Sequence, residues 1–332
     1  MKKMLISVAC ACFVLPFLWP QSPQNSPPPK FALVIGNGAY TGLSRLVNPV
    51  NDANDVAAVL EGLGFSVDKI LDGSLEQMES AVMRLKNRLS VSGESYGFFF
   101  YAGHGVQSNG ENFLIPVDAN IPGENFLKNR AVSVQLVLDE LNDARNSLNV
   151  VVLDACRDNP FSWGRSGNRG LAMISRQPAD SIIVYATSAG QQASDGTGRN
   201  GLFTSQLLNN LGDQNLDVSE VFRRTGLDVS EASDRRQVPA VYNQFFRTAY
   251  LGTGPKPVSI FETGMASAAI GTLEILTVSA GRVQIVGAAV NETVELSAYG
   301  QLPIEKINAG SYKITILYGL YPVRSTQLSS FF

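Results

Sequence analysis

Histidine and cysteine are scarce in this chain of 332 residues. His104 is the only histidine, and the three cysteines are Cys10, Cys12 and Cys156. Zinc sites in proteins draw mainly on these two residue types, so a zinc ion here would need ligands from carboxylates. We therefore expect no metal and no cofactor, while a calcium requirement stays open.

Charged side chains are also few. They make up 17% of the residues, the formal net charge is −3, and no long run of one sign occurs. A chain without a basic patch lacks the electrostatic footprint of a nucleic-acid-binding protein, so we expect no nucleic-acid partner. Hydrophobic residues reach 45%, which is enough for a substantial core and argues against a disordered chain.

A long uninterrupted apolar run is missing as well. The start, "MKKMLISVACACFVLPFLW", has two lysines and then an apolar stretch that is short for a membrane span and contains a proline. This pattern predicts a secretory signal peptide over residues 1–20, with an uncleaved anchor as the alternative, followed by a proline-rich linker over residues 21–29. The mature protein would be periplasmic or extracellular, and Cys156 would be its only cysteine.

Apolar strands alternate with amphipathic helices between residues 30 and 252. This alternation predicts an α/β domain with a mainly parallel sheet that helices cover on both faces. The expected strands lie at 31–36, 65–71, 96–103, 112–118, 148–156 and 180–188. The expected helices lie at 48–64, 74–90, 133–144, 201–211 and 217–233, and residues 244–252 close the domain.

The composition changes beyond residue 252. A linker over 253–270 precedes short alternating strands in 271–332, a pattern typical of a small all-β domain. Its "LPIEKINAGSYKITILYGLYP" run resembles the PEGA-type β repeat found on exported bacterial proteins. The segment carries no candidate catalytic residues, so its expected role is to bind a surface or a protein partner, or to act as a spacer.

The rare residues His104 and Cys156 occupy equivalent places in the predicted sheet. One follows the strand at 96–103 and the other ends the strand at 148–156. If these strands are parallel neighbours, both residues reach the same edge, about 4.8 Å apart, where open α/β sheets bind ligands. An imidazole beside a thiol can form the thiolate and protonate a leaving amine, so the pair predicts a cysteine hydrolase. The alternative is a cysteine that only fills core space.

Glycines flank the histidine in "AGHGV". They let a substrate backbone approach closely, and the amide of Gly105 can face a developing oxyanion. The amide of Cys156 is the expected second donor.

Several motifs occur together in a recognisable order. "FALVIGNGAY", "YAGHG", "NFLIPVDA", "VVLDACR", "IVYATS" and "RRQVP" follow one another over residues 30–250. The ordered set resembles the caspase-like cysteine peptidases, and most of all the paracaspases and their bacterial relatives. The resemblance implies a caspase-like fold, endopeptidase activity, and His104 and Cys156 as the catalytic dyad. A non-catalytic scaffold with this fold is the alternative.

The residue two positions before the nucleophile indicates specificity. It is Asp154, which resembles the acidic pocket of metacaspases and paracaspases and predicts cleavage after arginine in preference to lysine. Asp52 matches a second pocket acid, although acids are also favoured in a first helical turn. The place of a third acid holds Gln192, with Asp195 three residues on. Arg45 could neutralise the pocket.

The segment that follows Cys156 is long and rich in arginine. Residues 157–180 read as a loop, and the resemblance implies that such a loop is often cleaved during maturation. Arg165, Arg169 and Arg176 are the candidate self-cleavage sites. The expected partners are protein or peptide substrates with arginine or lysine at the cleaved position. A homodimer through a sheet edge, as in caspases and paracaspases, stays open because metacaspases tend not to pair.

Overall fold

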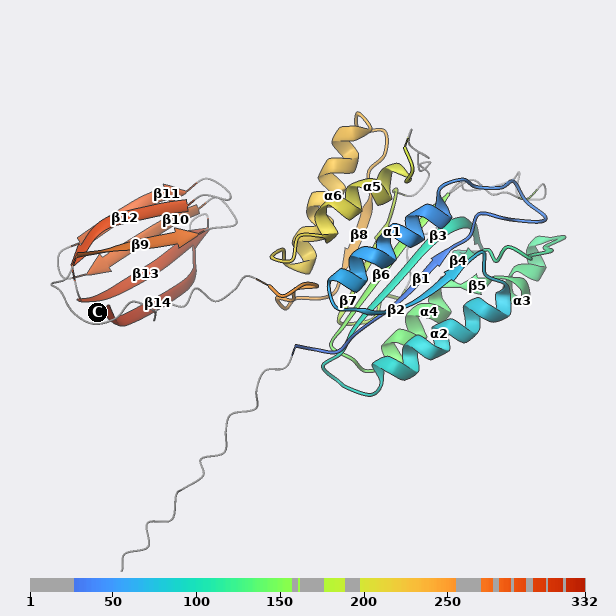
Figure 1. The fold of residues 1–332 in the computed structure, drawn as a ribbon, viewed down its shortest axis with the longest axis horizontal. Helices are drawn as coiled ribbons and strands as arrows, with labels where there is room; N and C mark the ends of the chain where they lie inside the picture. The colour runs from blue at the N-terminus through green and yellow to red at the C-terminus, as the bar shows by residue number, and fades with distance from the viewer. Residues whose placement is uncertain are drawn as a thin grey trace, which may run out of the picture. The chain divides into compact units, whose positions relative to one another are not determined.

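The chain divides into two compact units. The computed structural model describes residues 27–156, 161, 176–188 and 198–254, together with strands between residues 270 and 331 (Figure 1). The first unit comprises Met1–Pro257 and the second Val258–Phe332.

One sheet of mostly parallel strands forms the centre of the first unit. Its order is β2-β1-β3-β6-β7-β8, and every neighbouring pair is parallel except β7 and β8. The strands are β1 (Lys30–Gly36), β2 (Ser66–Leu71), β3 (Tyr96–Ser108), β6 (Leu148–Cys156), β7 (Ser181–Tyr185) and β8 (Ala240–Asn243). The predicted α/β fold with a mainly parallel sheet is confirmed.

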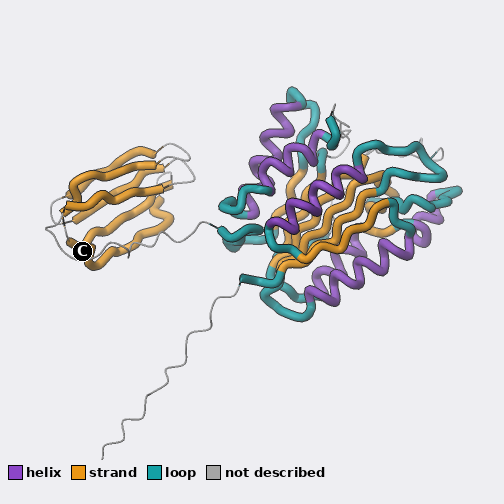
Figure 2. Tube along the Cα trace, viewed as in Figure 1, coloured by secondary structure: helices purple, strands orange, loops and turns teal. Residues whose placement is uncertain are grey.

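Helices cover both faces of this sheet (Figures 1 and 2). The helices α1 (Pro49–Gly62), α5 (Leu202–Leu211) and α6 (Val218–Ala232) pack on one face, and α2 (Leu75–Leu89) and α4 (Val134–Asp143) on the other. Alternation along β3 supplies both cores, because Phe98 and Phe100 face the first set of helices and Phe99 and Tyr101 the second. Within the described residues, no helix is long and apolar enough to cross a membrane.

The third strand is longer than the sequence predicts. It was expected to end at residue 103, yet β3 continues to Ser108 and forms a hairpin with β4 (Glu111–Leu114), which also pairs with β5 (Val132–Ser133). His104 therefore lies inside the strand and not beyond it. Both backbone polar groups of His104 are hydrogen-bonded. Its N–H donates to the Tyr40 hydroxyl (2.8 Å), and its C=O accepts from the Ile115 amide (3.0 Å).

The end of the domain also differs from expectation. Strand β8 was not predicted, because four residues are too few to show a periodic pattern. The segment 244–252, expected to close the domain, forms an isolated bridge between Asp217 and Tyr250, and its residues Phe245, Ala249 and Leu251 pack in the core. The described part of the first unit also contains a short helix α3 (Leu127–Arg130) and a 3₁₀ turn at Glu124–Phe126.

The described part of the second unit consists of antiparallel strands only. One sheet has the order β11-β10-β13-β14, and β12 pairs with β9. The strands are β9 (Ile270–Leu276), β10 (Gly281–Gly287), β11 (Val290–Leu296), β12 (Gln301–Asn308), β13 (Gly310–Tyr318) and β14 (Tyr321–Phe331).

Candidate active site

The register between β3 and β6 brings the two rare residues together. In this parallel pair, His104 lies opposite Cys156 and Ala102 opposite Asp154. Neighbouring strands are about 4.8 Å apart, so the backbones of His104 and Cys156 are adjacent. Strand β6 ends at Cys156, which places both residues at the carboxyl edge of the sheet.

The His104 side chain is buried and held in one orientation. It is 5% exposed, its ring lies 4.6 Å from the Tyr40 ring, and its Nε2 atom is 2.8 Å from the Ser44 carbonyl oxygen. A carbonyl oxygen can only accept, so Nε2 carries the proton of the neutral imidazole and Nδ1 carries the lone pair. Nδ1 is therefore the nitrogen that can act as a base.

Gly103 is needed for this arrangement. Its φ is 155°, and a Cβ atom there would lie 2.6 Å from the Tyr40 hydroxyl and 2.7 Å from the Tyr101 hydroxyl. Both hydroxyls hold the backbone of His104, because Tyr40 accepts from its N–H and Tyr101 donates to its C=O at 2.7 Å. A side chain at residue 103 would displace the two tyrosines that fix the histidine.

The direction of the Gly105 amide follows from the strand. The N–H and C=O of His104 point to the side of β3 on which Tyr40 and Ile115 lie. Successive residues of an extended strand alternate in this direction, so the Gly105 N–H points to the opposite side, on which β6 lies. This is the side of Cys156.

Two carboxylates converge beside this edge. Asp52, in the first turn of α1, is 3% exposed, and its Oδ1 accepts the Gly201 amide at 3.1 Å. Asp154, on β6, accepts the Thr204 hydroxyl at its Oδ2 atom, 2.6 Å away. A Cβ atom built on Gly201 would lie 3.5 Å from the Oδ2 atom of each acid. The amino-terminal turn of α5 thus holds both acids around one point.

This convergence changes the protonation of Asp52. Burial, followed by the nearby charge of Asp154, raises the pKa of Asp52 to about 7. Hydrogen bonds from Asn200 and from the Gly201 amide act in the opposite direction but do not outweigh these effects. Near neutral pH, the proton of Asp52 is therefore only weakly held.

The nearest charged residues on these elements are already paired. Arg199 forms an ion pair with Asp55, with its Nε atom 3.0 Å from Oδ2, and Asn200 donates to the same carboxylate at 2.9 Å. The hydrogen bond from Arg199 lowers the pKa of Asp55. Arg45, which the sequence analysis considered as a cation for the pocket, is exposed.

Four contributors to this site escaped the sequence analysis. They are the Ser44 carbonyl, the Tyr40 hydroxyl, the Gly201 amide and the Thr204 hydroxyl. Two of these are backbone groups, which leave no signature in a sequence. Thr204 is fully buried, and a threonine near the start of a predicted helix gave no reason to single it out.

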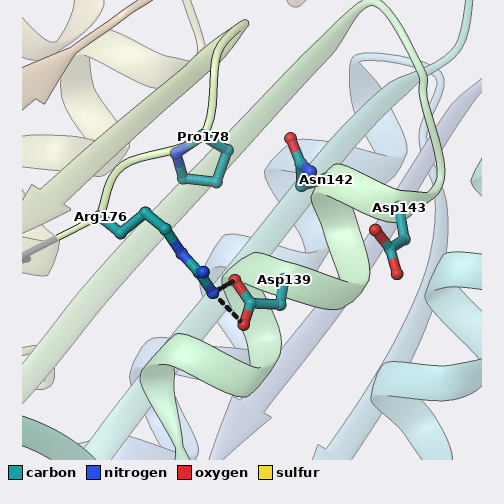
Figure 3. A pocket seen from close by; sticks show the side chains of 5 residues that line it. All are labelled: Asp139, Asn142, Asp143, Arg176 and Pro178. Atoms are coloured by element: carbon teal, nitrogen blue, oxygen red, sulfur yellow. Dashed lines mark hydrogen bonds and ion pairs between the residues drawn. The ribbon is translucent and has the colours of Figure 1, made fainter.

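Among the other predicted pocket residues and loop arginines that follow Cys156, the structure describes only Arg176. Gln192, Asp195, Arg165 and Arg169 lie outside the described residues. Arg176 is described, and its guanidinium forms two hydrogen bonds with the Asp139 carboxylate, at 2.7 and 2.8 Å (Figure 3).

The pair between Arg176 and Asp139 lies in a separate pocket, which Asn142, Asp143 and Pro178 also line (Figure 3). Helix α4 ends just before β6 begins, so this pocket is at the amino end of β6 and Cys156 is at its other end. We therefore treat this pocket as separate from the site that contains Asp52 and Asp154.

Known proteins resemble this chain. The sequence model of the caspase domain, a peptidase family, matches residues 29–250. Human mucosa-associated lymphoid tissue lymphoma translocation protein 1 is 34% identical over 128 residues, which are 39% of this chain and 15% of the human protein.

Two further relatives match a similar share of the chain. The paracaspase of Dictyostelium discoideum is 28% identical over 137 residues, which are 39% of this chain and 31% of that protein. A probable protease of a Desulfuromonadales bacterium is 25% identical over 149 residues, which are 42% of this chain and 18% of that protein. The chain thus spans less than a third of the length of each relative.

The contacts around Gly103 lead to a prediction about stability. Gly103→Ala should lower the free energy of unfolding by about 1–3 kcal/mol, because the new methyl group would overlap two buried hydroxyls. Urea denaturation of the two proteins would measure the difference. Gly62→Ala is the matched control, since a Cβ atom there meets nothing within 4 Å. Equal stabilities of the two variants would contradict the role given to Gly103.

Proposed function

Since this chain belongs to the caspase domain family of peptidases, we propose that it is a cysteine endopeptidase that cleaves after basic residues, arginine before lysine, through His104 and Cys156. The observation that carries the specificity is the convergence of two acids, the buried Asp52 of α1 and the half-buried Asp154, which lies two residues before Cys156 on β6. Two carboxylates at one such point need a cation to offset their charge, and a basic side chain of the substrate supplies one.

The dyad performs the covalent chemistry. Nδ1 of His104 takes the proton of the Cys156 thiol, and the thiolate attacks the carbonyl carbon of the peptide bond. The imidazolium keeps its Nε2–H on the Ser44 carbonyl, which stabilises the added positive charge. The Nδ1–H then protonates the leaving amine, and water hydrolyses the acyl-enzyme with the imidazole again as base.

The oxyanion of the tetrahedral intermediate needs donors on the same side as the thiol. The Gly105 amide points toward β6 and is the first donor in this proposal. The amide of Cys156 is the second. Both are backbone groups fixed by the strand pair, so they need no rearrangement when the charge develops.

Specificity is assigned to the acid pair. A guanidinium has a planar fork of donors that matches a carboxylate, whereas an ammonium is a compact point charge with only three donors. Two carboxylates around one point therefore favour arginine over lysine and exclude an acidic residue at the cleaved position. Asp195, outside the described residues, remains a candidate third acid.

The other expectations stay predictions of this proposal. Export with a signal peptide or anchor over residues 1–20, a homodimer, and a partner for the β unit are among them. Self-processing in the loop after Cys156 is another. Arg176 would have to leave Asp139 before its guanidinium could enter a peptidase pocket.

Loss of either dyad residue should stop the reaction. Cys156→Ala should abolish hydrolysis of an arginine peptide, and His104→Ala should lower kcat by at least about 10³-fold, because dyad members act as a unit. Initial rates with a fluorogenic peptide would measure both, and circular dichroism would check that the variants fold. A Cys156→Ala protein with full turnover would refute the proposed catalysis.

The acids should determine which residue is cleaved. Asp154→Asn should lower kcat/KM for an arginine peptide by roughly 30-fold or more, because breaking a buried charge pair costs about 2–5 kcal/mol and 1.4 kcal/mol is about tenfold. Asp52→Asn should act in the same direction.

Asp55→Asn is the matched control for this experiment. It removes a carboxylate of the same helix that pairs with the exposed Arg199. We expect a change in kcat/KM of no more than roughly threefold, as for most exposed ion pairs. If Asp55→Asn lowered kcat/KM for the arginine peptide as much as Asp154→Asn, the loss would reflect the net negative charge of this region and not a specific contact in the acid pocket.

A further inference from the structure

The acid pair places the buried carboxylate of Asp52 beside the half-buried carboxylate of Asp154. Asp52 is 3% exposed, and Gly201 brings its Oδ2 atom and that of Asp154 around one point, 3.5 Å from each. The Gly201 amide donates a hydrogen bond to Asp52, and the Thr204 hydroxyl donates one to Asp154. Like charges at such a site resist simultaneous ionisation.

From this geometry we propose that the free pocket holds one proton on the pair Asp52 and Asp154, and that an arginine or lysine side chain displaces this proton to solvent when it binds. The inference rests on the proposed function and adds a regulation to it. Charge balances in the exchange, since one cation enters as one proton leaves. The pocket would therefore bind basic substrates better as the pH rises toward neutrality and beyond.

The groups around Asp52 indicate which acid holds the proton. Asp154 on β6 and Asp55 on α1 both raise its pKa, whereas Asn200 and the Gly201 amide lower it. Arg199 forms its ion pair with Asp55. Burial has the largest effect and, like the two acids, it raises the pKa of Asp52, which reaches about 7. Asp52 is thus the member of the pair that titrates near neutral pH.

The sign of the pH effect follows from this assignment. Only the deprotonated pair attracts the basic side chain of a substrate. The affinity for arginine or lysine peptides is therefore complete above the pKa of Asp52 and is lost as the pH falls through it. Below that pKa, each pH unit should weaken binding by roughly tenfold, because a proton must leave for each side chain bound. A neutral side chain of the same shape displaces no proton and should bind equally at all these pH values.

Calorimetry can count the proton directly. The Cys156→Ala chain would be titrated with a blocked peptide that has arginine at the cleaved position, and with a twin peptide that has neutral citrulline there. Each titration would be run in two buffers of different protonation enthalpy, from about pH 5.5 to 8.5. For arginine we expect release of nearly one proton at about pH 6 and almost none at about pH 8.5, with no release for citrulline.

A substitution locates the proton. Asp52→Asn should abolish proton release, whereas Asp55→Asn should retain it. Retained release in Asp52→Asn would overturn the inference, and so would a pH-independent affinity of the unsubstituted pocket for arginine.

The outcomes also separate this inference from the proposed function. If arginine binds more tightly than citrulline at every pH without proton release, the specificity stands and only the exchange fails. If arginine has no advantage over citrulline at about pH 8.5, where the pair is charged, the proposed specificity fails and the inference with it.

Discussion

The site depends on the register of two parallel strands. Pairing β3 with β6 so that His104 lies opposite Cys156 also places Ala102 opposite Asp154. A slip of one residue would turn every side chain of one strand to the other face and move His104 out of register with Cys156. The buried aromatic run of β3 fixes the register, because Phe98 and Phe100 face one core and Phe99 and Tyr101 face the other. The positions of His104 and Cys156 are therefore set by the packing of the strand that carries the histidine.

A second constraint is the cost of burying charge. Asp52 comes from α1 and Asp154 from β6, and the first turn of α5 contacts both through Gly201 and Thr204. These three elements are far apart in sequence, so a cooperative fold is needed to assemble the pair. In the proposed function, the same burial that would make the pocket selective for a cation also makes its charge sensitive to pH. The proposed selectivity and the proposed pH dependence thus have one physical origin.

Much of this arrangement could be predicted from the sequence. Strand β6 was expected at its observed bounds, since its apolar run has a clear end at Cys156. Asp154 could be singled out because it lies two positions before that cysteine. The extension of β3 past His104 was missed, because "HGVQS" lacks an apolar run and is held by tertiary hydrogen bonds. The Ser44 carbonyl could not have been found, since any residue supplies the same group. Contacts between a side chain and a distant backbone leave no periodicity to detect.

The central claim is that a pocket of acids beside a His/Cys pair selects a basic residue for cleavage. The most direct test is kcat/KM of the unsubstituted protein for peptides that differ only at the cleaved position, with arginine, lysine, citrulline or aspartate there. The account predicts arginine first, lysine second, and citrulline and aspartate far behind. Aspartate above arginine would contradict the acidic pocket and would place a cation such as Arg45 in it.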